Sequence, residues 1–430
     1  MTTRAQQVTQ ERSPAKRAAL LLGPGFITGV ADDDPSGIGT YAVAGASLGL
    51  ATLWTALLTF PLMASVQNIC ARLGLVAGDG LAGILRRHYP RPVLYGAVAI
   101  VIVANTINLG ADLGAIGDAL GIITGVHAVW LAVPIALAIL AVQVFASYHI
   151  IERIFKFLTL ALFAYIVDAF LVHPDVGQTL RATIVPTIQF DRDYLMTLVA
   201  ILGTTISPYL FFWQASHEIE EEKEAGNPKA RKRGATRLQL RVATIDVNIG
   251  MFVSNLVMYF VILATAVTLH AAGKNTIQTG ADAAEALRPL AGDLAGLLFA
   301  AGMIGTGLLA IPVLSGSAAY AVSEAFGWKR GLNEDWRRAK PFYAVIAAAT
   351  IIGVLVNFTP VKPIDALFLT SLIMGGVAPP LLVLVMLAAR DRQVMGEKRI
   401  GLALTVVGWT AVAVTFVVLA GLVYETLLPS

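Results

Sequence analysis

Residues 29–39 read Gly-Val-Ala-Asp-Asp-Asp-Pro-Ser-Gly-Ile-Gly, an acidic, helix-breaking run inside a stretch otherwise apolar enough to cross a bilayer. A charged side chain near the bilayer centre costs several kcal/mol unless it faces water, a partner or an ion. The adjacent carboxylates of Asp32, Asp33 and Asp34 therefore predict a functional site that needs a cation. Because Pro35 lacks an N–H and the glycines relax the helix, we expect the carbonyls near Ala31 and Asp32 to face that ion.

The composition of the whole chain indicates a membrane protein. Of 430 residues, 57% are hydrophobic and 14% are charged, and the mean hydropathy is +0.73, outside the usual range of soluble domains. About eleven apolar stretches are long enough to span a bilayer. They begin near Ala19, Ala51, Val93, Val129, Ile150, Tyr194, Ile245, Leu290, Phe342, Ile364 and Gly401. The sequence therefore predicts an all-α polytopic membrane protein.

The basic residues predict how these spans are oriented. Most of the 31 lysines and arginines, including the run Lys229-Ala-Arg-Lys-Arg, fall in alternate connections, as expected if those connections and the N-terminus are cytoplasmic. We therefore predict a cytoplasmic tail over residues 1–18, a ten-helix core over 19–390, and a cytoplasmic loop with an accessory eleventh helix over 391–430. The predicted location is the cell (inner) membrane, with an extracytoplasmic C-terminus. The N-terminal segment lacks the features of a cleaved secretory signal.

Several classes of function are disfavoured by the sequence. The net charge of +3 is not a nucleic-acid signal, because the basic residues set topology and meet lipid headgroups. Cys70 is the only cysteine, which excludes an intramolecular disulfide and a cysteine-based metal cluster. No nucleophile–base constellation, thiol pair or phosphate loop indicates an enzyme, and no tightly bound cofactor is expected. The expected partners are a divalent metal ion as substrate and the lipid bilayer, with a monomer sufficient for transport.

A second helix break lies in the sixth span, where residues 203–209 read Gly-Thr-Thr-Ile-Ser-Pro-Tyr. Broken first and sixth spans predict two inverted halves, residues 19–172 and 193–390, with the site at their interface. The half-helices that end near Asp32 and Thr204 point negative poles at the gap and favour a cation there. Hydroxyls of Ser36, Thr205 or Ser207 beside a carboxylate suit magnesium, calcium or manganese better than copper or zinc.

These motifs resemble those of the natural-resistance-associated macrophage protein (NRAMP) family of divalent-metal transporters, over nearly the whole chain. Gly23-Pro-Gly-Phe-Ile and Asp34-Pro-Ser-Gly resemble the family's Gly-Pro-Gly-Phe and Asp-Pro-Gly-Asn, and Ala44-Gly-Ala-Ser-Leu-Gly continues the match. Ala71-Arg-Leu-Gly-Leu-Val-Ala-Gly is similar to the family's Ala-Arg-Leu-Gly-Ile-Val-Thr-Gly. The resemblance implies a leucine-transporter-like fold with the metal held between the broken first and sixth helices.

The chain departs from the family at the expected ligands. The family's asparagine falls on Gly37, its methionine on Ser207 and its histidine on Tyr209, and a later histidine aligns with Gln214. Losing the methionine sulfur removes a preference for soft metals, and losing the histidines removes the usual proton route. The pattern is closest to the NRAMP-related magnesium transporters, a branch with a larger cavity for partly hydrated Mg²⁺.

The resemblance and the helix breaks together give a candidate residue set. In the third and tenth spans, Asp112 aligns with an acidic residue of the family's proton pathway and Ser371 with a glutamine near the site. The predicted metal ligands are Asp34, Ala31, Gly37, Thr204 and Ser207. The predicted supporting or vestibule residues are Asp32, Asp33, Ser36, Thr205, Tyr209, Asp112, Asn108 and Ser371.

Structural explanations stay open for several of these residues. Asp34 can act as an ordinary helix cap, and the hydroxyls of Thr204 and Ser207 can bond helix carbonyls instead of a metal. Asp112 can be a structural acid that bonds Asn105 or Asn108. We interpret Asp246 and Asn248 as packing and interface groups, and we place Asp168 and His173 near an external boundary.

The sequence favours import of a hard divalent cation, Mg²⁺ with Mn²⁺ also accepted, by alternating access without obligatory proton coupling. Two alternatives keep the transporter class. One is a proton-coupled Mn²⁺/Fe²⁺ transporter of the ordinary NRAMP type, and the other is a sodium-coupled transporter of a small organic solute. The second would use an aromatic wall of Tyr209, Phe211, Phe212 and Trp213. A metal-sensing receptor is a further, weaker alternative.

Overall fold

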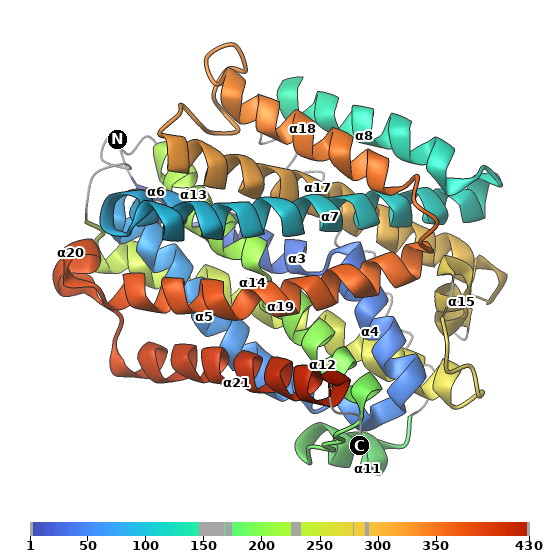
Figure 1. Ribbon diagram of the computed structural model, residues 1–430. Helices are drawn as coiled ribbons and strands as arrows, with labels where there is room; N and C mark the ends of the chain where they lie inside the picture. Colours follow the sequence, from blue (N-terminus) through green and yellow to red (C-terminus); the bar gives the residue numbers. More distant parts are fainter. Residues whose placement is uncertain are drawn as a thin grey trace.

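The computed structural model describes residues 3–145, 167, 174–224, 234–277, 279–288 and 292–427, and these residues form helices and connections without a strand. The helices pack side by side into one bundle (Figure 1). The predicted span near Ile150, the predicted boundary residues Asp168 and His173, and the basic run at 229–233 lie outside the described residues.

The helices follow the predicted spans closely. Their bounds are α1 Arg4–Gln10, α2 Pro14–Leu21, α3 Pro24–Asp32, α4 Pro35–Leu48, α5 Thr55–Ala77, α6 Leu81–His88, α7 Arg91–Thr124, α8 Ala128–Phe145, α11 Val176–Ile184, α12 Arg192–Thr205, α13 Pro208–Glu224, α14 Arg237–Thr265, α15 Gly280–Ala284, α17 Ala295–Phe326, α18 Lys340–Val356, α19 Pro363–Arg390, α20 Arg392–Met395 and α21 Leu402–Leu427. Within the described residues, eight segments are long and apolar enough to cross a membrane. The broken pair α3/α4 and the shorter apolar α18 match two more predicted spans.

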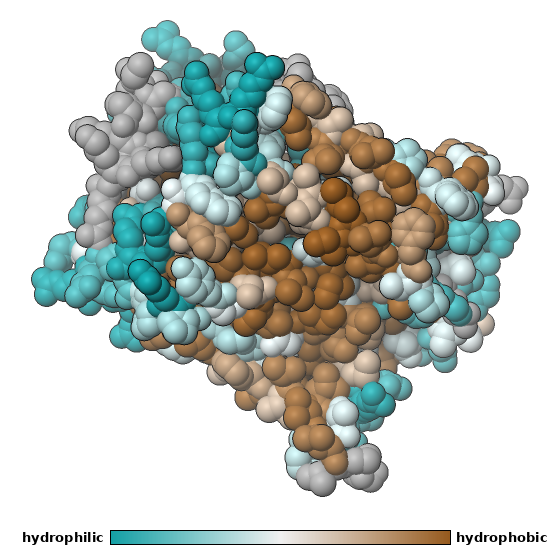
Figure 2. All heavy atoms as spheres, turned by 45° about the horizontal axis from the view of Figure 1, so that its top comes forward, coloured by the Kyte–Doolittle hydropathy of each residue, from teal (hydrophilic) through white to brown (hydrophobic). Residues whose placement is uncertain are grey.

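The surface matches a bilayer environment. In Figure 2, apolar residues form a broad band across the middle of the visible face, and hydrophilic residues gather toward its ends. The most apolar stretch of α12–α13 is 94% buried, whereas those of α8 and α21 are only 22% buried. The broken sixth span is therefore central to the bundle, while α8 and α21 present apolar side chains outward to lipid.

Glycines bring α3 directly onto α14. A Cβ on Gly29 would lie 2.2 Å from the carbonyl carbon of Gly250, and one on Gly25 would lie 2.5 Å from the backbone nitrogen of Val247. Small residues at such positions let helix backbones touch inside membranes. This packing fixes α3, and with it the acidic break at its end, against the seventh span.

Asp246 anchors the beginning of α3. Its carboxylate accepts hydrogen bonds from the backbone N–H groups of Gly23, Gly25 and Phe26 at 2.9–3.0 Å, and from Arg4 Nη2 at 2.9 Å. A carboxylate at a helix N-terminus satisfies orphan N–H groups and the positive pole of the helix dipole. The interpretation of Asp246 as an interface group is confirmed, and Asn248 likewise accepts a hydrogen bond from Asn68 at 3.0 Å.

Candidate cation site

The first helix break leaves a backbone carbonyl without its helical partner. Helix α3 ends at Asp32 and α4 begins at Pro35. The Ala31 carbonyl would normally accept from the N–H four residues later, but that residue is Pro35, which has none. Instead, the hydroxyl of Tyr209 donates to Ala31 O at 2.7 Å. The Ala31 carbonyl therefore lacks its helical hydrogen bond, as predicted, and it accepts a hydrogen bond from a side chain of α13 instead.

Asp34 sits in the gap and is 1% exposed. Its Oδ1 accepts from Ser36 Oγ at 2.6 Å and from Gly37 N at 2.7 Å, so it caps α4. Its Oδ2 accepts from Asn108 Nδ2 at 2.9 Å and from Tyr209 OH at 3.4 Å. The capping alternative is thus correct for Oδ1, whereas Oδ2 faces groups from α7 and α13. A cation that joined Ala31 O to Asp34 Oδ2 would take the place of the Tyr209 hydroxyl.

The second break, between Thr205 and Pro208, repeats this arrangement. Pro208 cannot donate to Thr204 O, and Ser207 Oγ contacts that carbonyl at 2.6 Å and Gly203 O at 3.0 Å. The hydroxyl of Thr205 bonds Ile201 O at 2.8 Å. Both Ser207 and Thr205 therefore donate to their own helix, which leaves their oxygens only as acceptors toward a hydrated ion.

Gly37 and Thr204 form a complementary pair across the two breaks. A Cβ on Gly37 would lie 2.9 Å from Thr204 Oγ1 and 3.5 Å from Asp34 Oδ1. Thr204 Oγ1 is buried and has no hydrogen-bond partner within the described residues. The threonine hydroxyl thus fills the space into which the family's asparagine side chain would extend, and it places an unpaired oxygen beside Asp34.

We expect Gly37→Asn to destabilise the protein by about 1–3 kcal/mol, because the new side chain overpacks against Thr204. Adding Thr204→Ala should recover most of that loss, since it removes the hydroxyl that the asparagine side chain would meet. Thermal unfolding of the two single variants and the double variant measures the coupling. Additive losses in the double variant would show that the two side chains do not compete for one space.

The remaining predicted residues surround Asp34 at different distances. Asp112 on α7 is fully buried, interacts electrostatically with Asp34 and with the backbone N–H of Ser36, and forms no hydrogen bond of usual geometry within the described residues. Ser371 on α19 bonds Ser36 O at 3.2 Å and accepts from Thr40 Oγ1 at 2.8 Å. Ser371 therefore holds the start of α4 and does not itself contact Asp34.

Asp32 and Asp33 turn away from Asp34 toward α14. Ser254 Oγ lies 3.0 Å from Asp32 Oδ2 and 3.1 Å from Asp33 Oδ1. Ser254 and Thr40 have no sequence signal that would have singled them out, because isolated hydroxyls are common in membrane helices. Both are identified only by their neighbours in the fold.

The electrostatics of the gap favour a cation. None of the described lysines and arginines forms an ion pair with Asp32, Asp33 or Asp34. The C-terminal ends of α3 and α12 add negative poles, while Asp34 offsets the positive end of α4. No group of three or more His, Cys, Asp or Glu side chains in the described part of the chain could hold a metal. The side-chain and backbone groups that hydrogen-bond Asp34 are all neutral.

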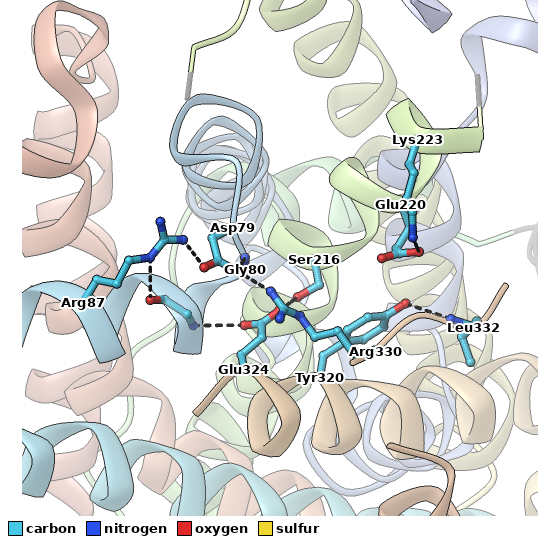
Figure 3. Close-up of polar contacts among 11 residues, drawn as sticks. Asp79, Gly80, Arg87, Ser216, Glu220, Lys223, Tyr320, Glu324, Arg330 and Leu332 are labelled. Carbon is cyan, nitrogen blue, oxygen red and sulfur yellow. Dashed lines mark hydrogen bonds and ion pairs between the residues drawn. The ribbon is translucent and has the colours of Figure 1, made fainter. Parts of the chain in front are cut away.

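A polar network centred on Glu324 and Arg330 joins several helices near one end of the bundle (Figure 3). Glu324, near the end of α17, accepts from Ser216 Oγ at 2.7 Å and from Gly83 N at 3.2 Å. It lies 3.3 Å from Arg330 Nε, and Arg330 and Arg87 both pair with Asp79. The network thus ties α6, α13 and α17 to the connection after α5.

Hydrogen bonds of Tyr320 on α17 and Tyr343 on α18 also fix the connection that follows α17. The Tyr320 hydroxyl accepts from Leu332 N at 3.4 Å, and the Tyr343 hydroxyl donates to Leu332 O at 3.0 Å.

Toward the other end of α7, a cavity of about 330 Å³ lies between α7, the start of α8 and the α18–α19 connection. Its lining includes Ala111 and Thr370, the chain neighbours of Asp112 and Ser371. A second cavity, of about 250 Å³, lies at the opposite end, between the end of α5 and the segment that follows α20.

Solved structures share this architecture. The Eremococcus coleocola manganese transporter superposes with a TM-score of 0.73 at 16% identity, covering 98% of this chain and 90% of that one. Mhp1, a nucleobase-cation-symport-1 family transporter, superposes in a closed conformation with a TM-score of 0.59 at 13% identity, covering 94% and 93%. The fold is the predicted leucine-transporter-like fold with broken first and sixth spans.

Sequence comparison leads to the same class of protein. Proteins named divalent metal cation transporter MntH are 27% identical in Deinococcus radiodurans, over 96% of this chain and 91% of the relative, and 26% identical in Agrobacterium fabrum, over 94% and 86%. The family model described as natural resistance-associated macrophage protein-like matches residues 25–425. The chain belongs to this NRAMP family of divalent-metal transporters.

Proposed function

We propose that this membrane transporter imports hard divalent cations, Mg²⁺ and Mn²⁺, through the site at Asp34. The observation that carries the proposal is a buried carboxylate, unpaired with any described lysine or arginine, beside a carbonyl that Pro35 frees and surrounded by oxygen donors. Oxygen ligands of this kind suit hard cations, and Mg²⁺ keeps several waters when it binds. Ser207 stands where the family has methionine, so no sulfur selects softer metals.

A second candidate is the proton-coupled Mn²⁺/Fe²⁺ transporter of the ordinary family type. The similar sequences are named divalent metal cation transporters and the similar solved structure a manganese transporter, and the latter name favours Mn²⁺ as the main ion. Against proton coupling stands Tyr209, whose hydroxyl replaces an imidazole that titrates near neutral pH. We therefore propose transport without obligatory coupling to protons.

Uptake by proteoliposomes tests both parts of the proposal. We expect entry of Mg²⁺ and of Mn²⁺, with no acidification of the lumen during Mn²⁺ entry. Absence of flux for both ions would refute the transport proposal. Mn²⁺ flux that stops without a proton gradient, together with no Mg²⁺ flux, would instead establish the ordinary family mechanism.

Ser207→Met should move the preference toward soft metals. A thioether beside Asp34 adds a ligand that Cd²⁺ accepts and Mg²⁺ does not, so the ratio of Cd²⁺ to Mg²⁺ affinity should rise by about tenfold or more, about 1.4 kcal/mol. Titration calorimetry on the wild type and on Ser207→Met measures the ratio, with Ser207→Ala as the control without a sulfur. An unchanged ratio would place residue 207 outside the coordination sphere.

For alternating access, we propose that the end closed by the Glu324 network is the cytoplasmic end and opens during transport. The α6 and α20 helices lie at this end in Figure 1, and basic residues such as Arg87, Arg330 and Arg392 belong to it. The cavity at the other end then faces outward. The accessory helix α21 would carry the C-terminus to the outer side.

Arg330→Ala should favour opening at this end. Removing one partner of a buried ion pair costs about 3–5 kcal/mol in the closed state, so the open population should rise at least about tenfold. Labelling of Ser207→Cys by a membrane-impermeant maleimide from the cytoplasmic side, in a Cys70→Ser background, reports the opening. Lys329→Ala is the matched control, because Lys329 is half exposed and its one ion pair among the described residues is with Glu334, at 3.0 Å. Equal labelling of both variants would contradict the assignment.

A further inference from the structure

Asp32 and Asp33 form a carboxylate pair that the site at Asp34 does not use. A single hydroxyl, Ser254 Oγ on α14, contacts both side chains, at 3.0 Å and 3.1 Å. The close contact of Gly29 with Gly250, one helical turn before Ser254, sets this approach. The pair is therefore built into the packing of α3 on α14.

This pair lacks charge compensation from the protein. Both side chains are 0% exposed, and neither forms an ion pair with a described lysine or arginine. Ser254 carries one hydroxyl proton and can donate to only one carboxylate at a time. Asp32 Oδ1 and Asp33 Oδ2 have no hydrogen-bond partner within the described residues. Two buried carboxylates in this state need a cation or protons.

A tyrosine from another helix supplies an independent indication of a ligand. Tyr41 on α4 is fully buried, and its hydroxyl has no hydrogen-bond partner within the described residues. It interacts electrostatically with Asp32, Asp33 and Asp34, and its hydroxyl neighbours Thr204, whose Oγ1 likewise lacks a hydrogen bond of usual geometry within the described residues. A buried hydroxyl normally finds a partner, so two neighbouring hydroxyls that lack a hydrogen bond of usual geometry, close to buried carboxylates, point to a group that the protein does not supply.

We propose that Asp32 and Asp33, with the hydroxyls of Ser254 and Tyr41, form a second binding site for a hard divalent cation, next to the transport site. Two carboxylates balance the charge of one divalent cation, and Mg²⁺ and Mn²⁺ commonly bind one or two carboxylates together with waters. The inference rests on the proposed function, since the cation is the transported one. Two adjacent sites let an arriving ion weaken the hold on the ion ahead of it.

The stoichiometry of Mn²⁺ binding tests the second site. Equilibrium dialysis with Mn²⁺, on the full chain in nanodiscs, should give two ions per wild-type chain. Asp34→Asn should retain one ion, and the double variant Asp32→Asn/Asp33→Asn should retain the other, which also shows that it is folded. Ser254→Ala keeps both carboxylates and should weaken the second ion by about 10–100-fold. Asp365→Asn, at an exposed aspartate in the first turn of α19, should still bind two.

The outcomes separate this inference from the proposed function. One Mn²⁺ per wild-type chain, lost in Asp34→Asn and kept in the double variant, would refute the second site and leave the transport site intact. That result would mean that protons neutralise Asp32 and Asp33. A wild-type chain that binds no Mn²⁺ would overturn the proposed function and the second site together.

Discussion

Asp34→Asn is expected to abolish cation uptake, with a loss of more than about 100-fold, which exceeds the usual effect of changing a residue that only supports a metal ligand. Asparagine keeps the shape of the side chain and can still accept from Ser36 or Gly37 to cap α4. It removes the negative charge that the proposed ion would pair with, and it replaces one of the two carboxylate oxygens, such as the one that faces Asn108 and Tyr209. Uptake of Mn²⁺ and Mg²⁺ by proteoliposomes measures the loss.

The control for this prediction is Asp365→Asn, which removes a charge at an exposed position of α19 and should leave uptake unchanged. An unchanged temperature of thermal unfolding for Asp34→Asn would show that the variant is folded, so that the loss of uptake is a loss of function. Uptake that stays within about twofold of the wild type would show that Asp34 is only a helix cap, since capping alone contributes about 1 kcal/mol.

Asp246→Ala should cost about 3–5 kcal/mol of stability and lower the temperature of thermal unfolding. The substitution leaves Arg4 without its closest carboxylate and leaves the N–H groups of Gly23, Gly25 and Phe26 without an acceptor. Since these groups begin α3, we also expect α3 to loosen from α14. Fluorescence-detected size-exclusion chromatography after heating gives the shift for the purified full chain.

A matched aspartate with fewer contacts calibrates this effect. Asp118 accepts one backbone hydrogen bond, from Gly280 at 3.0 Å, so Asp118→Ala should cost about 1–2 kcal/mol. Equal shifts for Asp118→Ala and Asp246→Ala would show that the anchor of α3 contributes no more than an ordinary hydrogen bond. Asp246→Asn, which keeps one acceptor oxygen, should fall between the two.

The helix breaks were predictable from the sequence because proline acts locally. Pro35 removes the donor for Ala31 O and Pro208 removes the donor for Thr204 O, wherever the helices lie in the fold. The all-α class, the spans outside the undescribed segments and the family follow equally from local composition and motifs. These are the features that one segment of chain determines alone.

The partners of the site residues could not be predicted, since they depend on tertiary packing. The sequence shows that Gly37 replaces an asparagine and that residue 204 is a threonine, but only the fold brings these two together. The same holds for Ser254, which is more than 200 residues from Asp32 and Asp33 and lies against them because Gly29 meets Gly250. Tyr209 was expected near the site, and its bond to Ala31 O required the structure.

The most direct measurement of the central claim is titration calorimetry of the wild-type chain with Mg²⁺, Mn²⁺, Ca²⁺ and Cd²⁺, each repeated on Asp34→Asn. If Asp34 and its oxygen neighbours hold a hard, partly hydrated cation, Mg²⁺ and Mn²⁺ bind, Asp34→Asn removes the ion held at Asp34 and leaves at most the ion at Asp32 and Asp33, and Cd²⁺ binds no more tightly than Mn²⁺. Tight Cd²⁺ binding to the wild-type chain, with Mg²⁺ binding absent or unchanged in Asp34→Asn, would contradict it.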